Sequence, residues 1–230
     1  MTEALVIDQD RLKSLRGLGH GSHTANDDGK CCVMEAVAWV THKDWTDHPP
    51  CVCPVIGAFM RSWNDGLPND EVRGRLLLPL VPALVSTKGS EALEQRRATM
   101  AADWLVRVHT PAWLKHAGLT QQADALASLP EITDFKNCPS LMPTLEAVRK
   151  DANAARAAAR AAAWAAAGAA ARAAAWDAAW AAAGDAARAA ARAAAGAAAR
   201  AVFKPTEEEL QQSAIKLVER MCALTDEDLK

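Results

Sequence analysis

The chain has no tyrosine and only three phenylalanines among its 230 residues. It also has no Gly-rich phosphate loop, no G-x-S-x-G turn and no H-E-x-x-H pair, which excludes the common motifs of nucleotide hydrolysis, serine hydrolysis and zinc proteolysis. Its net charge of -2 argues against bulk nucleic-acid binding, which usually needs a clearly basic domain. No sequence pattern implies a cofactor.

Long apolar runs are missing as well. Arg or Asp recurs too often in the alanine-rich part of the chain for that part to span a bilayer. The N-terminal residues MTEALVIDQD lack the basic start and apolar core of a signal peptide. We therefore expect no membrane association and a cytoplasmic location.

What the chain has in excess is alanine, from Ala152 to Ala201. Alanine is the best helix former, so this alanine-rich tract predicts a long helix. Every fourth residue interrupts the alanine: Arg156, Arg160, Trp164, Gly168, Arg172, Trp176, Trp180, Gly184, Arg188, Arg192, Gly196 and Arg200. Four residues advance about 400°, so this stripe drifts by about 40° per repeat, which excludes a long two-stranded coiled coil.

The tract has three interpretations. It is a low-complexity expansion, a surface on which alanine faces pack closely in a bundle, or a ligand surface of Trp rings and Arg side chains. Six Arg against only Asp177 and Asp185 between residues 154 and 201 favour an anionic partner. The predicted ligand-binding residues are Arg156, Arg160, Trp164, Arg172, Trp176, Trp180, Arg188 and Arg192.

The rest of the sequence predicts helices and no strands, so the expected fold is all-α. We expect a compact multi-helix domain over residues 1–139, an alanine-rich helical tract over 140–203, and a C-terminal amphipathic helix over 204–230. Phe203-Lys204-Pro205 is the expected end of the tract helix, and Thr206 with Glu209 predicts a capping box for the last helix. The individual helices expected before the tract cover residues 8–18, 31–41, 54–66, 69–85 with breaks at Pro79 and Pro82, 90–108, 110–118, 120–128 and, from Ser140, a helix that runs into the tract.

Six cysteines suggest buried free thiols in a chain of this size. The alternative is a zinc site, although the spacing fits no standard C-x-x-C pair. Its candidate ligands are His20, His23, Cys31 or Cys32, Cys51 and Cys53.

Three segments of the first half carry a resemblance: Cys32-Val33-Met34-Glu35-Ala36, Trp45-Thr46-Asp47-His48-Pro49 and Ser62-Trp63-Asn64-Asp65. Over about residues 25–130 the chain resembles an uncharacterised family of phage-encoded and actinobacterial proteins with C-x-M-E-A, D-x-P and N-D motifs and variable alanine-rich tails. The resemblance implies an ancestry and no particular reaction.

The polar residues of these motifs are Glu35, Asp47, His48, Asn64 and Asp65. A buried carboxylate facing an Asp-His loop could bind a metal or act as a general base. The structural interpretation, which we favour, is that Asp47 caps a turn, Asn64 and Asp65 satisfy a helix end, and Glu35 binds loop amides.

The sequence thus favours a non-enzymatic, homo-oligomeric helical protein that binds an anionic nucleotide-type ligand through Arg and Trp of the tract. By analogy with the phage resemblance, that ligand would be a host immune nucleotide. One alternative is a scaffold or oligomerisation protein without a small ligand. The second is a metal-dependent enzyme that uses Glu35, Asp47 and His48.

Overall fold

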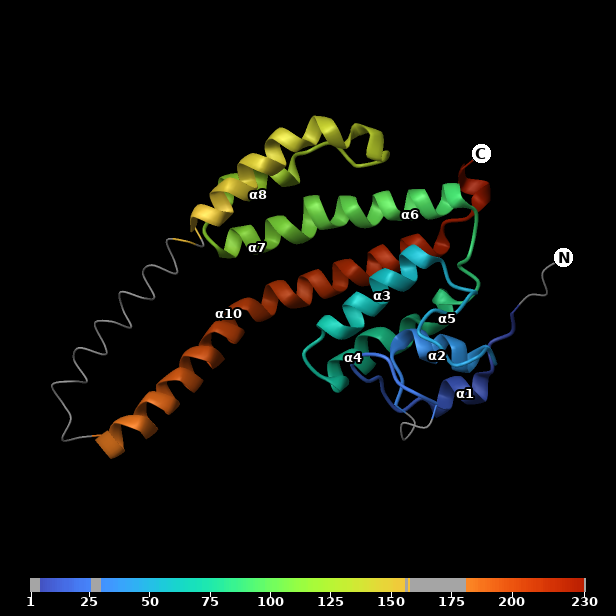
Figure 1. The fold of residues 1–230 in the computed structure, drawn as a ribbon, viewed down its shortest axis with the longest axis horizontal. Helices are drawn as coiled ribbons and strands as arrows, with labels where there is room; N and C mark the ends of the chain where they lie inside the picture. The colour runs from blue at the N-terminus through green and yellow to red at the C-terminus, as the bar shows by residue number, and fades with distance from the viewer. Residues whose placement is uncertain (1–4, 26–29, 156, 158–180, 230) are drawn as a thin grey trace. The chain divides into compact units, whose positions relative to one another are not determined.

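The computed structural model describes residues 5–25, 30–155, 157 and 181–229, and over these residues its regular elements are all helices (Figure 1). The expected all-α class is therefore confirmed. The described chain divides into two units. The first comprises residues up to Trp104 together with Ile132–Phe135 and Gln211–Lys230, and the second comprises Leu105–Glu131 and Lys136–Leu210. These units cut across the three segments expected from the sequence, because the C-terminal residues join the first unit.

The first unit begins with three helices that lie within the expected ranges: α1 (Gln9–Ser14), α2 (Val33–Val40) and α3 (Pro54–Gly66). Helix α1 ends at Ser14, before the expected end at Leu18. The Asp8 side chain caps α1 by accepting hydrogen bonds from the backbone N–H groups of Asp10 and Arg11. Pro54 occupies the first turn of α3, where its missing N–H costs nothing. Helix α2 is buried along nearly its whole length, so its polar ends need partners within the protein.

Prolines divide the next helical segment as the sequence predicts. Helix α4 (Asp70–Leu77) starts at Asn69, whose side chain accepts from the Val72 N–H at 2.9 Å. A 3-10 turn, η1 (Leu78–Leu80), contains Pro79, and the short α5 (Val81–Leu84) contains Pro82. These breaks let Leu77, Leu80 and Leu84 all reach the same core.

Helix α6 (Glu91–Trp104) continues through a π-helical turn, η2 (Leu105–His109), into α7 (Thr110–His116). The expected start at Thr110 is confirmed, but no loop precedes it. Pro111 cannot donate a backbone hydrogen bond, and the wider π turn accommodates this loss while the Thr110 hydroxyl bonds back to the Leu105 carbonyl at 2.7 Å.

The second unit contains η2, α7, α8 (Thr120–Ala127) and a helix over residues 138–155, which follows the 3-10 turn η3 (Phe135–Asn137). Gly118 joins α7 to α8 with a φ of 75°, a backbone conformation that favours glycine. The small core of this unit is formed by Leu114, Ala123, Leu126 and Val148.

Helix α10 (Ala181–Ala223) overturns the predicted stop at Phe203-Lys204-Pro205, because Pro205 lies inside it. Thr206 is an interior helical residue and not a cap, so the predicted capping box is also wrong. A proline inside a helix costs about 3 kcal/mol. In this case contacts with α7 hold the helix on both sides of the proline: the Phe203 ring lies 5.3 Å from the His116 ring, and Thr206 Oγ1 lies 2.5 Å from His116 Nε2.

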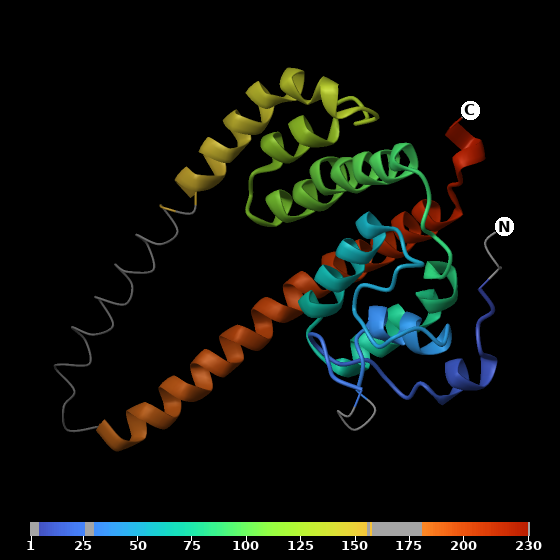
Figure 2. The ribbon, with the colours of Figure 1, turned by 45° about the vertical axis from the view of Figure 1, so that its right-hand side comes forward.

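Helix α10 also passes Gly184 and Gly196, two of the weak points expected from the sequence, without a break in the helix. The third, Gly168, lies outside the described residues. The C-terminal end of α10 lies beside α3 and α6 in both views (Figures 1 and 2), and its Leu217, Val218 and Met221 belong to the core that holds Ile56, Met60 and Met100. The chain then closes with a 3-10 turn, η5 (Asp226–Leu229).

Two buried arginines secure helix ends in the first unit. Arg97 donates to the carbonyls of Met221, Leu224 and Thr87, and Arg73 donates to the carbonyls of Asn64 and Leu67 and to Asp70. Both side chains are about 98–99 % buried. A cation near the C-terminal carbonyls of a helix interacts favourably with the helix dipole, so these arginines fasten the ends of α3 and α10.

Candidate functional site

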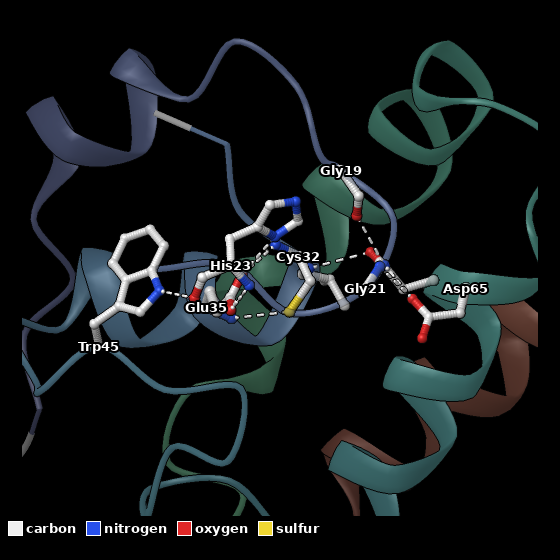
Figure 3. Close-up of polar contacts among 9 residues, drawn as sticks. Gly19, Gly21, His23, Cys32, Glu35, Trp45 and Asp65 are labelled. Atoms are coloured by element: carbon white, nitrogen blue, oxygen red, sulfur yellow. Dashed lines mark hydrogen bonds and ion pairs between the residues drawn. The ribbon is translucent and has the colours of Figure 1, made fainter. Parts of the chain in front are cut away.

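A connected polar site lies at the N-terminus of α2 (Figure 3). Cys32 is the N-cap, and its Sγ accepts from the Glu35 backbone N–H at 3.4 Å. The Glu35 carboxylate reaches back and accepts from the Cys32 N–H at 2.7 Å, which completes a capping box. Glu35 is only 1 % exposed, so its charge needs further donors.

His23 supplies those donors from the loop before α2. Its backbone N–H donates to Glu35 Oε1 at 2.6 Å, and its Nδ1 lies 3.0 Å from Glu35 Oε2. The indole N–H of Trp45 in turn donates to the His23 carbonyl at 2.8 Å. A Cβ on residue 19 would lie 2.6 Å from His23 Nε2, so Gly19 is what lets the imidazole ring seat there.

Asn64 and Asp65, near the end of α3, hold the same loop. Figure 3 shows Asp65 beside Gly21. Asn64 Oδ1 accepts from the Val33 N–H at 3.2 Å, and its Nδ2 donates to the Gly19 carbonyl at 2.9 Å. Asp65 Oδ1 accepts from Asn64 Nδ2 and from the Gly21 N–H. The loop is therefore fixed to α2 by Glu35 and to α3 by the Asn64-Asp65 pair.

The electrostatics of this site disfavour reactive groups. Desolvation opposes ionisation of Asp65, but the hydrogen bonds from Asn64 and Gly21, together with the nearby charges of His20 and Arg73, lower its pKa below the usual 3.8. Burial, reinforced by the Glu35 charge, raises the pKa of the Cys31 thiol to about 11 and that of Cys32, again mainly by burial, to about 12. Both thiols are protonated at neutral pH and are poor nucleophiles.

The structure places Glu35 as the favoured interpretation has it. Its two oxygens accept from the N–H groups of Cys32 and His23, so the prediction that it binds loop amides is confirmed. Asn64 satisfies the start of α2 rather than the end of its own helix, which corrects its expected role. His23 is the partner of Glu35 in this site, whereas the sequence suggests His23 only as a candidate zinc ligand.

Asp47 and His48 form a separate pair in the loop before α3. His48 Nδ1 lies 2.6 Å from Asp47 Oδ1, and His48 is 66 % exposed. The backbone N–H of His48 is capped by Thr46 Oγ1 at 3.0 Å, so Thr46 fills the capping role expected of Asp47. Over the ranges that the structure covers, no three His, Cys, Asp or Glu side chains come together as a metal site, and Glu35 is not part of the Asp47-His48 pair.

The cysteines are free thiols: Cys31, Cys32, Cys51 and Cys53 are buried, and Cys138 and Cys222 are partly exposed. The default expectation of free thiols is met, and burial holds for four of the six.

The predicted ligand-binding residues of the tract fall outside this site. Arg156, Arg160, Trp164, Arg172, Trp176 and Trp180 lie outside the described residues. Arg188 and Arg192 belong to α10, of which the structure describes only the backbone at these positions.

Fold and site together define an all-α protein with a buried carboxylate that fastens a loop to the start of a core helix. Comparison of the chain with protein-family models, with curated proteins and with solved structures gave no match. In the part of the chain that the structure describes, no helix is long and apolar enough to cross a membrane.

Proposed function

We propose that this protein is a non-enzymatic binding protein that assembles with copies of itself and holds an anionic, ring-bearing ligand of nucleotide type on its alanine-rich tract. The recognition chemistry is that of Arg and Trp, which pair with phosphate and stack on planar rings. A phage origin and a host immune nucleotide as the ligand remain part of this proposal only through the family resemblance of residues 25–130.

The observation that carries the proposal is the continuity of α10. This helix begins at Ala181 within the tract and runs 43 residues to Ala223, and its last turns are buried in the first unit through Leu217, Val218 and Met221. Arg97 caps its C-terminal carbonyls from inside the same core. The second part of the tract is thus an extension of a core helix, which favours a role within the folded protein over a tolerated expansion.

The buried site supports the non-enzymatic part of the proposal. Glu35 is the best candidate for a general base, but both of its carboxylate oxygens already accept hydrogen bonds from donors of the protein itself. A general base must be within hydrogen-bond reach of a substrate proton. Glu35 instead has the arrangement of a charged cap at a helix N-terminus, where the helix dipole also favours a negative charge.

Binding is tested by titration calorimetry of the full chain with ATP and with a cyclic dinucleotide, and assembly by native mass spectrometry. Arg156→Ala, Arg172→Ala and Trp176→Ala are expected to weaken nucleotide binding at least tenfold while the oligomer persists. The exposed Arg75 of α4 provides the control, because Arg75→Ala removes the same charge elsewhere. A metal-free monomer that binds neither nucleotide would overturn the proposal.

A second candidate is a scaffold that only assembles. Val202 and Phe203 on α10 are apolar side chains that are 62 % and 36 % exposed, which favours an apolar contact with another copy. Val202→Ser, which leaves the ring contact of Phe203 with His116 in place, would then dissociate the oligomer. Nucleotide binding that is absent in the wild type, combined with an oligomer that Val202→Ser breaks, would support the scaffold over the binding protein.

A further inference from the structure

A cleft of about 270 Å³ lies in the first unit beside the first turns of α3, and Glu35 is not among the residues that line it. Its rim carries His48, Arg61 and Lys88, and its floor is formed by Met34, Val52 and Gly57. The described residues that line it all precede the tract in the sequence, and the following inference does not rest on the proposed function.

Arg61 is the principal charge of the cleft. Its Nη1 donates to the backbone carbonyl of Asp47 at 3.0 Å, which positions the guanidinium without neutralising it. Within the described ranges no carboxylate pairs with Arg61. A planar guanidinium has five N–H donors, so those not used by the Asp47 carbonyl can bind an oxyanion through two parallel hydrogen bonds.

Lys88 adds a second cation at the rim, although a weaker one. Its Nζ lies 2.5 Å from Glu94 Oε1, and the side chain is half exposed, so solvent and Glu94 reduce its attraction for a ligand. The start of α3 contributes in the same sense, because its N-cap residue Cys53 makes no side-chain hydrogen bond to the first turn. The positive end of the helix dipole is therefore not compensated by a side chain at this end of the cleft.

The floor of the cleft is apolar, and it is open beside Arg61 because residue 57 is glycine. A Cβ at this position would lie 3.3 Å from Arg61 Nη1, 3.9 Å from Val52 Cγ1 and 4.0 Å from Met34 Cε. The missing side chain thus leaves room beside both the cation and the apolar wall. The volume is below the about 300–1,000 Å³ of pockets that take drug-sized ligands, which limits the occupant to a small molecule.

We propose that this cleft binds a small organic anion, with its carboxylate or phosphate on the Arg61 guanidinium and its apolar part over Met34 and Val52. Carboxylate and phosphate share this recognition, and the experiment separates them. The apolar floor distinguishes the expected ligand from an inorganic anion, which would gain nothing from it.

The test is titration of the full-length protein with phenyl phosphate, benzoate and inorganic phosphate, followed by calorimetry or by NMR shifts of the α3 amides. One of the two organic anions is expected to bind with a Kd of about 1 mM or below, and at least fivefold tighter than inorganic phosphate. Equal binding of inorganic phosphate, or no binding of either organic anion at 10 mM, would overturn the proposal.

Variants assign the binding to the cleft. Arg61→Gln is expected to weaken binding of the organic anion at least tenfold, and Lys88→Gln two- to threefold. Arg75→Gln removes the same charge from an exposed position on α4 and is expected to leave binding unchanged. Binding that is the same in Arg61→Gln and in the wild type contradicts the proposal.

Gly57→Ala tests the cleft without removing a charge. Alanine favours the helix by up to about 1 kcal/mol relative to glycine, so the thermal unfolding temperature is not expected to fall unless the cleft cannot take the methyl group. We expect at least threefold weaker binding from the narrower floor. If Arg61→Gln unfolds, as judged by circular dichroism, Lys88→Gln and Gly57→Ala decide the question, and unchanged binding in both overturns it.

Discussion

The cores that stabilise the two units of this protein differ in size and in composition. The first unit has an extended core to which α2, α3, α4, α5, α6 and the end of α10 all contribute, so residues far apart in the sequence meet there. Among the residues of the second unit that the structure describes, the core cluster has four buried members, which lie on α7, α8 and the helix over residues 138–155. Burial of apolar surface contributes about 25 cal/mol per Å², so the first unit has much the larger share of the hydrophobic stabilisation.

The two units also differ in their buried polar side chains. The polar side chains that are buried within the described residues all belong to the first unit: Glu35, Thr41, Asn64, Arg73, Thr87, Arg97 and Thr99. Each of these is hydrogen-bonded, mostly to backbone groups at helix ends. Such bonds add little net energy when made but are costly to leave unmade, so they specify one arrangement of helices.

The largest effect on the free energy of unfolding is expected from removing the hydrogen bonds of Glu35. Glu35→Ala leaves the buried N–H groups of Cys32 and His23 without their acceptor and is expected to lower the free energy of unfolding by about 3–5 kcal/mol. Glu35→Gln keeps the shape and one acceptor and should lose less. Urea unfolding followed by tryptophan fluorescence and circular dichroism measures both.

The matched control is Glu71→Ala, which removes the same charge from an exposed site on α4. It is expected to change the unfolding free energy by about 0.5 kcal/mol or less. Equal midpoints for Glu35→Ala and Glu71→Ala would show that the polar network does not specify the first unit.

A pair of core truncations compares the two units directly. Leu77 is fully buried in the first unit and Leu126 is 2 % exposed in the second, so Leu→Ala at either site is expected to cost its own unit about 2–4 kcal/mol. Amide hydrogen exchange should accelerate in α2 to α5 for Leu77→Ala. For Leu126→Ala it should accelerate in α7, α8 and residues 138–155. Faster exchange in both units from the Leu126 variant would mean that the second core is not an independent source of stability.

The smallest expected effect is a dependence on acid pH from Asp65. Since its pKa is lowered in the folded state, its carboxylate stabilises the fold above about pH 4, and this contribution is lost as the pH falls through the folded pKa. Asp65→Asn keeps an acceptor for Gly21 but does not titrate.

Thermal unfolding measured at pH 5 and at pH 3 tests this dependence. The wild type is expected to lose more stability between these two pH values than Asp65→Asn does. The same loss in both proteins would assign the acid sensitivity to other carboxylates.

Most helix positions could be predicted from the sequence because local signals carry them. Pro54 and Gly66 bound α3, Pro79 and Pro82 divide the segment after α4, and Gly118 closes α7. The prediction failed at Pro205, where the local signal for a helix end is strong. Phe203 and Thr206 contact α7, which is far away in the sequence, so no local pattern predicts these contacts.

The candidate site was only partly predictable. The Cys32-x-x-Glu35 spacing is a capping box with a thiol in place of the usual hydroxyl, so this half of the site could have been found by extending the pattern to cysteine. The pairing of Glu35 with His23 and the hydrogen bond between Asn64 and Val33 could not have been predicted. In both pairs the partners are separated by loops whose conformation no local sequence pattern fixes.

The sequence by itself determined that the protein is all-α, that most helices before the tract begin and end where proline, glycine and capping residues lie, and that an alanine-rich tract begins at Ala152. Tertiary structure alone decided that α10 continues through Pro205, that Arg97 caps it from α6, that His23 is the partner of Glu35, and that Arg61 borders a cleft. Helix formation depends on residues within one or two turns of each other. The roles of charged side chains depend on partners that only the folded chain brings within hydrogen-bond distance.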